Sequence, residues 1–382
     1  MIPYGRQTID NDDIKAVVDV LQSELLTQGP AVPAFEQSVA SLCGASHAIA
    51  VNSATSALHV ACMALGVSQG DIVWTSPITF VASANCARYC GATVDFVDIN
   101  PLTQNMSVDS LTEKLKIAEL AGKLPKVVIP VHFAGHPCEM KPIHALGLKY
   151  GFKIIEDASH AIGARYHQTS TGDCTYSDIT VFSFHPVKII TTAEGGMATT
   201  RSDQLARKMQ LLRTHGITRD LNEIKHLDEG AWYYEQFELG YNYRMTELQA
   251  ALGLSQIKHI YDWLNRRHQI ADRYDDVLAE LPLTTTPRAT GDYSSLHLYC
   301  IQVDDRRRIF EQLRELGILV NVHYIPVHLQ PYYQSFGFRS GQFPHSERFY
   351  SKTISLPIYA GLSDENQDYV VRCVKTALNA KG

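Results

Sequence analysis

The chain has 382 residues, more than one hydrophobic core usually supports, so its length favours a large domain with a smaller one. Hydrophobic residues make up 45% and charged residues 19%, as in ordinary globular proteins, and the net charge of −6 argues against nucleic-acid binding, which needs a basic surface. No apolar run is long enough to span a membrane, and the start lacks signal-peptide features, so we expect a cytoplasmic protein that binds neither membrane nor nucleic acid.

Short apolar runs alternate with helical patterns between about residues 45 and 200. The expected strands lie at 47–51, 71–76, 93–99, 126–133, 152–157 and 178–184, and the expected helices at 54–66, 80–91, 108–122 and 139–150. This alternation predicts parallel strands in a sheet that helices cover on both faces. Active sites of such sheets form at the carboxyl ends of the strands.

The pattern changes after residue 202. Helical patterns at 202–216 and 245–281 precede a turn-rich stretch, and then come a strand at 297–303, a helix at 306–317, a strand at 318–324 and a final helix at 364–380. We therefore predict an N-terminal segment (1–25), a large α/β domain (26–264) and a smaller C-terminal α/β domain (265–382), with the first segment packing on either domain.

Eight cysteines are scattered along the chain: Cys43, Cys62, Cys86, Cys90, Cys138, Cys174, Cys300 and Cys373. Cys86 and Cys90 are four residues apart on an expected helix, but no CxxC or histidine-rich spacing accompanies them, so we predict no metal site. Reduced, mostly buried thiols are the simplest interpretation.

Polar and aromatic residues follow several of the expected strands. Ser53, Thr55 and Phe80 lie in the segments that follow strands, Asp157 ends a strand, and Lys188 stands in the apolar stretch FSFHPVKIITTAEGGM. These residue types suit pyridoxal phosphate. Its aldehyde needs a lysine amine, its ring nitrogen a carboxylate, its phosphate a helix N-terminus with hydroxyls, and its ring a flat apolar partner.

The motifs NSATSAL (52–58), SPITFVASAN (76–85), EDASHAIGA (156–164) and SFHPVKIITTAEGGM (183–197) resemble those of the nucleotide-sugar aminotransferases of the DegT/DnrJ/EryC1/StrS family. The resemblance covers nearly the whole chain, from LTQGPAVPAFE (26–36) to ISLPIYAGL (354–362). It implies the type I PLP-dependent transferase fold, a mainly parallel sheet sandwiched by helices with a smaller C-terminal α/β domain, and pyridoxal 5′-phosphate as cofactor.

Within the family, the motifs are similar to those of the aminotransferase of pseudaminic acid synthesis. This likeness implies transfer of an amino group from glutamate, which leaves as 2-oxoglutarate, to C4 of UDP-2-acetamido-2,6-dideoxy-β-L-arabino-hex-4-ulose. The alternatives are another nucleotide-linked keto sugar (a C3 ketone or a dTDP-linked one) or a non-catalytic protein of the same fold. Lys188 argues against sugar dehydration, for which such proteins carry histidine at that position, and NSATSAL is not the GxGxxG of a nicotinamide enzyme.

The resemblance also implies the cofactor contacts. Lys188 would attach the cofactor and then move the reacting proton, Asp157 would hold the ring nitrogen, and His160 would lie near the 3-oxygen. The phosphate would be bound by Ser53, Ala54, Thr55 and Ser183, and the ring would stack on Phe80. Asn242 would reach the phosphate in the neighbouring subunit, so we expect a homodimer with shared active sites.

The nucleotide-sugar contacts are expected at six positions: Gln28, Gly29, His185, Arg213, Tyr324 and His328. His185 could instead only shape the turn before Pro186, and Arg219 is an alternative to Arg213 as a partner for the diphosphate. No metal ligand is expected.

Overall fold

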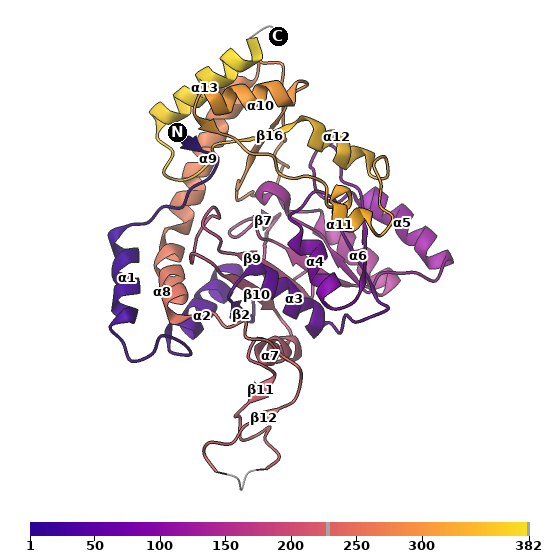
Figure 1. Ribbon diagram of the computed structural model, residues 1–382, viewed down its shortest axis with the longest axis vertical. Helices are drawn as coiled ribbons and strands as arrows, with labels where there is room; N and C mark the ends of the chain where they lie inside the picture. Colours follow the sequence, from indigo (N-terminus) through magenta and orange to yellow (C-terminus); the bar gives the residue numbers. More distant parts are fainter. Residues whose placement is uncertain (227–229, 380–382) are drawn as a thin grey trace.

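The computed structural model describes residues 1–226 and 230–379 (Figure 1). A seven-stranded sheet with helices on both faces forms the larger part, and a smaller group of helices and strands lies above it and holds both chain ends. A narrow two-stranded arm projects from the opposite end. No helix in these ranges is both long and apolar enough to cross a membrane.

The strand order of the large sheet is β2-β10-β9-β6-β5-β3-β4. Its members are β2 (His47–Val51), β3 (Ile72–Thr75), β4 (Thr93–Phe96), β5 (Val127–Ile129), β6 (Lys153–Asp157), β9 (Ile179–Ser183) and β10 (Gly196–Thr200). All six predicted strands of this region are present and run in one direction. β10 was not predicted and is antiparallel to both neighbours. The connection 184–195 contains no helix, so the chain cannot cross over and returns antiparallel.

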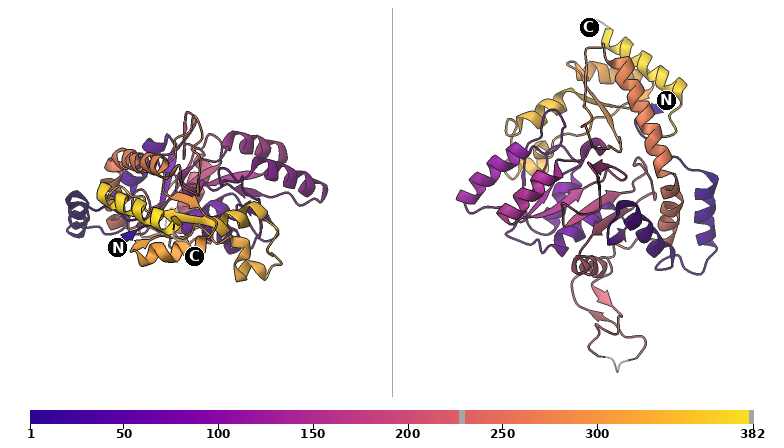
Figure 2. Two further views of the ribbon diagram at one scale, coloured as in Figure 1. Left: turned by 90° about the horizontal axis from the view of Figure 1, so that it is seen from above. Right: turned by 180° about the vertical axis from the view of Figure 1, so that it is seen from behind.

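Helices cover the sheet on two faces (Figure 2). One face carries α3 (Ala54–Ala64), α4 (Ala82–Tyr89) and α7 (Asp203–Leu212), and the other carries α2 (Ala31–Cys43), α5 (Val108–Leu120), α6 (Met140–Tyr150) and α8 (Glu247–Gln256). Side-chain caps start several of them: Ser53 accepts a hydrogen bond from the Ser56 N–H at 3.1 Å, and Thr246 with Gln249 forms a capping box.

The smaller part is built around the antiparallel sheet β13-β14-β16. Its elements are β13 (Thr284–Thr285), β14 (Tyr299–Gln302), β16 (Thr353–Leu356), α10 (Arg306–Glu315), α11 (Pro331–Gln334), α12 (Pro344–Lys352) and α13 (Asp364–Asn379). β1 (Ile2–Pro3) pairs with β15 (Ile318–Leu319), so the N-terminus packs here, while α1 (Asn11–Leu21) lies beside α8. α9 (Ile260–Leu278) passes without interruption through residues 264 and 265, and the three-part domain division stays a prediction.

Two sequence expectations differ in detail from the structure. The helix expected at 245–281 is two helices, α8 and α9, joined by the 3₁₀ turn η2 (Ile257–His259). The strand expected at 318–324 ends at Leu319, and residues 321–324 turn toward a pocket. Residue 380, the last of the expected final helix, lies outside the described residues. The remaining short elements are β7 (Arg165–Tyr166), β8 (Thr169–Ser170), β11 (Ile217–Thr218), β12 (Glu235–Gln236), η1 (Phe133–Gly135) and η3 (Val327–Leu329).

Glu156, on β6, is buried among three hydrogen-bond donors. His132 Nε2 lies 2.7 Å from its carboxylate, Ser177 Oγ 2.5 Å and Thr180 Oγ1 2.9 Å. The Cys138 N–H donates to His132 Nδ1 at 2.9 Å, so His132 Nε2 carries a proton and points it at Glu156. Burial alone would raise the pKa of Glu156, but these donors hold it below its usual value.

We expect Glu156→Gln to lower the free energy of unfolding by about 1.5–3 kcal/mol, because the amide places a donor where the protein supplies only donors. The pKa of Glu156 is depressed in the folded state, so its stabilising effect is present above its unfolded pKa and is lost as the pH falls. Urea denaturation at pH 7 and at pH 4 checks both points: the difference between wild type and variant should shrink at pH 4. An equal difference at both pH values would contradict this account.

Candidate active site

A pocket of about 540 Å³ opens at the carboxyl ends of β6 and β9. It is lined by the start of α3, the segment before α4, the loop between β9 and β10, and residues 321–324 from the smaller part. Ten of the sequence-predicted site residues line it: Ser53, Ala54, Thr55, Phe80, Asp157, His160, Ser183, His185, Lys188 and Tyr324. The chain therefore brings residues more than 250 positions apart in sequence to one cavity, since Ser53 and Tyr324 both face it.

Lys188 lies in the loop between β9 and β10, and its backbone N–H donates to the His185 carbonyl at 2.9 Å. The side chain is half-buried at the pocket wall. Burial lowers the pKa of Lys188 to about 8, and the attraction of Asp157 only partly opposes that shift. A considerable share of this amine is therefore neutral near physiological pH, as a nucleophile or base requires.

Capture of pyridoxal phosphate by the cofactor-free protein should accelerate with pH and level off above about pH 8, because only the neutral Lys188 amine can attack the aldehyde. Burial favours the neutral form in the folded protein, so the plateau comes well below the pH expected for an exposed lysine. The growth of visible absorbance after mixing measures the rate. A rate that keeps rising to pH 10 would show that the pKa of Lys188 is not lowered.

Asp157 ends β6 and is only 4% exposed. The Ser83 hydroxyl donates to its Oδ2 at 2.5 Å, and the Ser159 N–H donates to its Oδ1 at 3.1 Å. These bonds fix the carboxylate at the pocket wall, where it can meet a cationic ring nitrogen. Ser83 was missed in the sequence, although it lies within the SPITFVASAN motif.

His160 packs against Tyr324, and its Nε2 lies 3.1 Å from the tyrosine hydroxyl. The Ala134 N–H donates to His160 Nδ1 at 3.3 Å, so the neutral ring carries its proton on Nε2. Burial, together with Lys188 and His323, keeps the pKa of His160 well below its ordinary value. His160 therefore donates to the Tyr324 oxygen, and the Tyr324 hydroxyl proton can be donated to a ligand.

The start of α3 forms an anion site beside the Lys188 loop. The first N–H groups of a helix have no partner within it, and here those of Ala54 and Thr55 lie at the pocket with the Ser53 and Thr55 side chains. A Cβ added at Gly196 would come within 2.5 Å of the Ala54 nitrogen, so glycine permits β10 to pass directly against this helix start. Amine, carboxylate and anion site therefore face one cavity, and the residues present fit pyridoxal phosphate.

Five predicted site residues lie outside the pocket. Arg213 is paired with Glu36 and donates to the Ala50 carbonyl at 2.7 Å, so its guanidinium is already engaged. His328 is fully buried and bonds Glu347 at 3.0 Å. The other three are exposed or half-exposed at the protein surface: Gln28, Gly29 and Asn242. The structure of one subunit thus does not bring Arg213 or His328 to the cavity, and the expectation that they contact the sugar gains no support.

Two polar pocket residues, Tyr4 and Asn321, had no sequence signal. Tyr4 reaches the cavity because β1 is tied to β15, and Asn321 follows that strand. His323 lies in the segment HYIPVH (323–328), which the sequence placed near the sugar. His323 Nδ1 lies 2.8 Å from the Ser355 hydroxyl, and burial lowers its pKa to about 3, so it is neutral. Only the pairing of β1 with β15 could have identified Tyr4 and Asn321.

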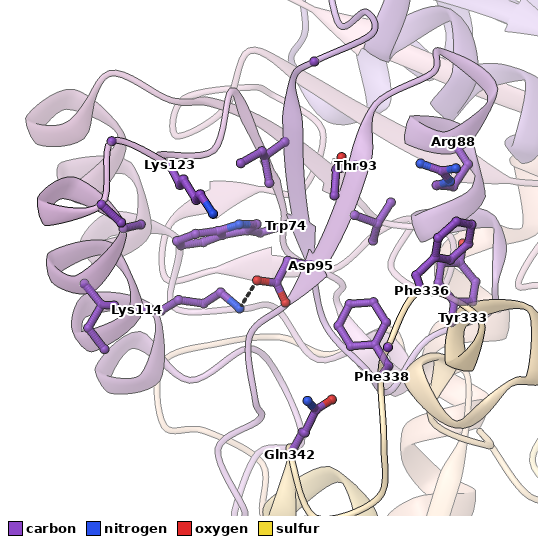
Figure 3. A pocket seen from close by; sticks show the side chains of 18 residues that line it. Trp74, Arg88, Thr93, Asp95, Lys114, Lys123, Tyr333, Phe336, Phe338 and Gln342 are labelled. Atoms are coloured by element: carbon purple, nitrogen blue, oxygen red, sulfur yellow. Dashed lines mark ion pairs between the residues drawn. The ribbon is translucent and has the colours of Figure 1, made fainter.

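A larger cavity of about 1080 Å³ lies at the outer edge of the sheet, beside β4 and α5 (Figure 3). Lys114 points at Asp95 there with a separation of 2.6 Å and covers the Trp74 ring at 5.0 Å, while Phe336 and Phe338 form the opposite side. None of the predicted site residues lines it. The smaller pocket at the strand ends is therefore the candidate active site.

Comparisons with known proteins agree with this assignment. The DegT/DnrJ/EryC1/StrS aminotransferase family matches residues 7–375. The spore coat polysaccharide biosynthesis protein SpsC of Bacillus subtilis is 39% identical over 98% of this chain and 96% of its own length. The UDP-4-amino-4,6-dideoxy-N-acetyl-beta-L-altrosamine transaminase of Campylobacter jejuni is 37% identical over 97% of this chain and 96% of its own length.

Solved structures give the same result. Helicobacter pylori PseC, an aminotransferase involved in the biosynthesis of pseudoaminic acid, superposes with a TM-score of 0.90 at 33% identity over 99% of both chains. The PLP form of the sugar aminotransferase Spr1654 from Streptococcus pneumoniae superposes with a TM-score of 0.89 at 32% identity over 98% of both chains. The type I fold, the enzyme class and the cofactor predicted from the sequence are confirmed: the chain belongs to the DegT/DnrJ/EryC1/StrS aminotransferase family and is a pyridoxal-phosphate-dependent sugar aminotransferase.

Proposed function

We propose that the enzyme moves an amino group from glutamate to C4 of UDP-2-acetamido-2,6-dideoxy-β-L-arabino-hex-4-ulose, a step of pseudaminic acid synthesis. The observation that carries this proposal is the Campylobacter jejuni relative, named for the amino-sugar product of that step, which aligns with 97% of this chain. The pocket supports it with an amine of lowered pKa, Lys188, opposite a fixed carboxylate, Asp157.

The roles of the residues follow from their positions. Bound pyridoxal phosphate supplies an electrophilic carbon for the amino group and a ring that accepts the electrons of the broken C–H bond. Lys188 holds the cofactor and then moves the proton at the reacting carbon, while Asp157 keeps the ring nitrogen protonated. Ser53, Thr55, Ser183 and the Ala54 N–H bind the phosphate.

The other pocket side chains shape the space around the ring. His160, whose tautomer is fixed, would meet the 3-oxygen side of the bound cofactor, and the exposed Phe80 ring would cover one face of it. Tyr324 and His185 face the sugar side, where Tyr4 and Asn321 add further polar groups. Together they narrow the cavity around Lys188.

The test is to offer the purified holoenzyme glutamate with three acceptors: the UDP-linked L-arabino 4-ketone, its D-xylo epimer, and a dTDP-linked 4-keto-6-deoxy sugar. We expect the highest kcat/KM with the first, and nuclear magnetic resonance of the product should show an amine at C4. A higher kcat/KM with another acceptor would refute the proposed sugar. The alternative, a different nucleotide-linked keto sugar, is favoured by the 39% identity with a spore coat polysaccharide protein.

We further propose that two subunits share each active site. The arm that carries β11 and β12 projects away from the body of its own subunit (Figure 1) and bears five large exposed apolar side chains: Leu221, Trp232, Tyr234, Phe237 and Leu239. A monomer rarely exposes such a cluster. Asn242 lies exposed at the base of the arm, beside Asn52 and the start of α3, where a symmetric partner can be reached.

Co-expression of Lys188→Ala and Asn242→Ala subunits should restore about a quarter of wild-type kcat, although each variant alone is impaired. Half of the dimers are then mixed, and each mixed dimer has one site with both native residues. Turnover per total subunit measures this in the unselected mixture of dimers, purified through one tag that both variants carry. If the mixture only reached the sum of the two separate variants, Asn242 would belong to the same site as the lysine of its own chain.

A further inference from the structure

Gln256, the last residue of α8, lies between the first segment of the chain and the loop that carries Lys188. It is only 1% exposed. Its Oε1 accepts a hydrogen bond from the Thr191 N–H at 3.3 Å. Its Nε2 donates to the Thr8 carbonyl at 2.9 Å and to the Asp13 carboxylate at 2.5 Å. One buried amide therefore connects the start of α1 with the lysine loop.

The partners of Gln256 leave its amide one orientation. A peptide N–H can only donate, whereas a carbonyl and an ionised carboxylate can only accept, so the amide oxygen must face Thr191 and the amide nitrogen the other two groups. Asp13 is itself fixed, because the Asp10 N–H donates to the same carboxylate oxygen at 3.1 Å in a capping box at the start of α1. The second carboxylate oxygen has no hydrogen-bond partner among the described residues, so this buried carboxylate depends on the Gln256 side chain.

Thr191 passes this restraint on to the loop between β9 and β10. Its hydroxyl donates to the Phe184 carbonyl at 3.0 Å, and the N–H of the following residue donates to the same carbonyl at 3.0 Å. These bonds join the two ends of the segment 185–190, which carries Lys188 at the pocket wall. The position of the lysine amine therefore depends on where Gln256 holds the Thr191 N–H.

We propose that Gln256 is a positioning residue for Lys188: its amide, oriented by Asp13, fixes the loop that places the lysine amine at the pocket wall. The inference rests on the role proposed above for Lys188. Gln256 does not itself line the pocket, so it acts through the loop alone. A misplacement of about 1 Å can cost about 10²-fold in rate. Loss of the amide should therefore slow the steps that use the Lys188 amine, while the part of the pocket that binds the sugar stays intact.

The experiment compares Gln256→Met with a matched control, Gln367→Met. Gln367 is also 1% exposed, and its Nε2 donates to the Ile270 carbonyl of α9 at 2.8 Å, outside the pocket. Both variants lose a buried amide, so both should be less stable than wild type. They are compared at a temperature at which circular dichroism shows all three proteins folded.

We expect cofactor-free Gln256→Met to capture pyridoxal phosphate about 10–100-fold more slowly than wild type, and Gln367→Met to capture it at the wild-type rate. In the holoenzyme, kcat per bound cofactor should fall by a similar factor in Gln256→Met, with KM for the keto sugar within about twofold of wild type. A wild-type capture rate in Gln256→Met, or an equal slowing in Gln367→Met, would overturn the inference. Capture needs neither sugar nor amino donor, so it tests Gln256 even if the proposed sugar is wrong.

Gln256→Glu gives a second test that does not require Gln256→Met to fold. A protonated carboxyl group can accept from the Thr191 N–H and donate to Asp13 as the amide does, whereas the ionised group repels the Asp13 carboxylate. The other charged groups around the start of α1 are Asp10, Asp12 and His259. The capture rate of this variant relative to wild type should therefore be highest near pH 6 and fall toward pH 9. A relative rate that stays constant or rises with pH would contradict the role of Gln256.

Discussion

Replacing Lys188 with alanine should lower kcat by about 10²–10⁴-fold, the contribution of a positioned acid–base group. Lys188 is the one lysine that lines the candidate active site among the described residues, and burial lowers its pKa to about 8. The variant should also bind pyridoxal phosphate without the visible spectrum of the covalently attached cofactor. Steady-state turnover and absorbance after dialysis measure the two effects.

Lys153→Ala is the matched control. Lys153 lies on β6, where it pairs with Asp178 at 3.0 Å on the protein surface. It contributes an exposed ion pair of little energy, so this variant should keep wild-type kcat and spectrum. Wild-type turnover in Lys188→Ala would remove the lysine from the mechanism and with it the proposed role of the pocket.

Asp157→Asn should lower kcat by about 10²–10³-fold, because an amide cannot keep the ring nitrogen of the cofactor protonated. The side chain keeps its shape, and its one amide oxygen can still accept from the Ser159 N–H. Its amide nitrogen can donate to the Ser83 oxygen, because the Ser83 hydroxyl can turn its proton to Thr79 Oγ1 at 2.7 Å, so the melting temperature should change little. Turnover and thermal denaturation of the holoenzyme measure the two quantities.

For Glu156, the residue before Asp157, we expect the opposite result: a loss of stability without a loss of turnover. Glu156 lies next to Asp157 but bonds His132, Ser177 and Thr180 away from the pocket. Glu156→Gln should therefore lose stability while its folded fraction keeps turnover. If Asp157→Asn lost stability and retained kcat, Asp157 would be a structural residue like Glu156.

The location of the reactive groups could be predicted because it depends on local order in the sequence. Strand and helix patterns alternate up to residue 200, and the carboxyl ends of parallel strands meet at one edge. Asp157 and Ser183 each end such a strand, and Ser53 caps the helix that follows another. Their convergence on the Lys188 loop follows from the sheet, and the structure shows it.

The remaining features of the site could not be predicted, because they depend on contacts between segments that are distant in the sequence. Tyr4 and Asn321 enter the pocket only because β1 pairs with β15, which no local pattern reveals. Arg213 and His328 were expected to contact the nucleotide sugar, but Glu36 and Glu347 engage their side chains inside the protein. Whether a polar side chain faces a ligand or an internal partner is decided by tertiary packing.

The most direct test of the central claim is to mix the holoenzyme with an amino acid donor in the absence of any sugar. For glutamate, we predict loss of the visible absorbance band and release of about one 2-oxoglutarate per subunit, then no further turnover until a nucleotide-linked keto sugar is added. Glutamine, aspartate and alanine should be tried in parallel. An unchanged band and no 2-oxo acid with any of these donors would contradict the assignment of Lys188 and its pocket to amino-group transfer.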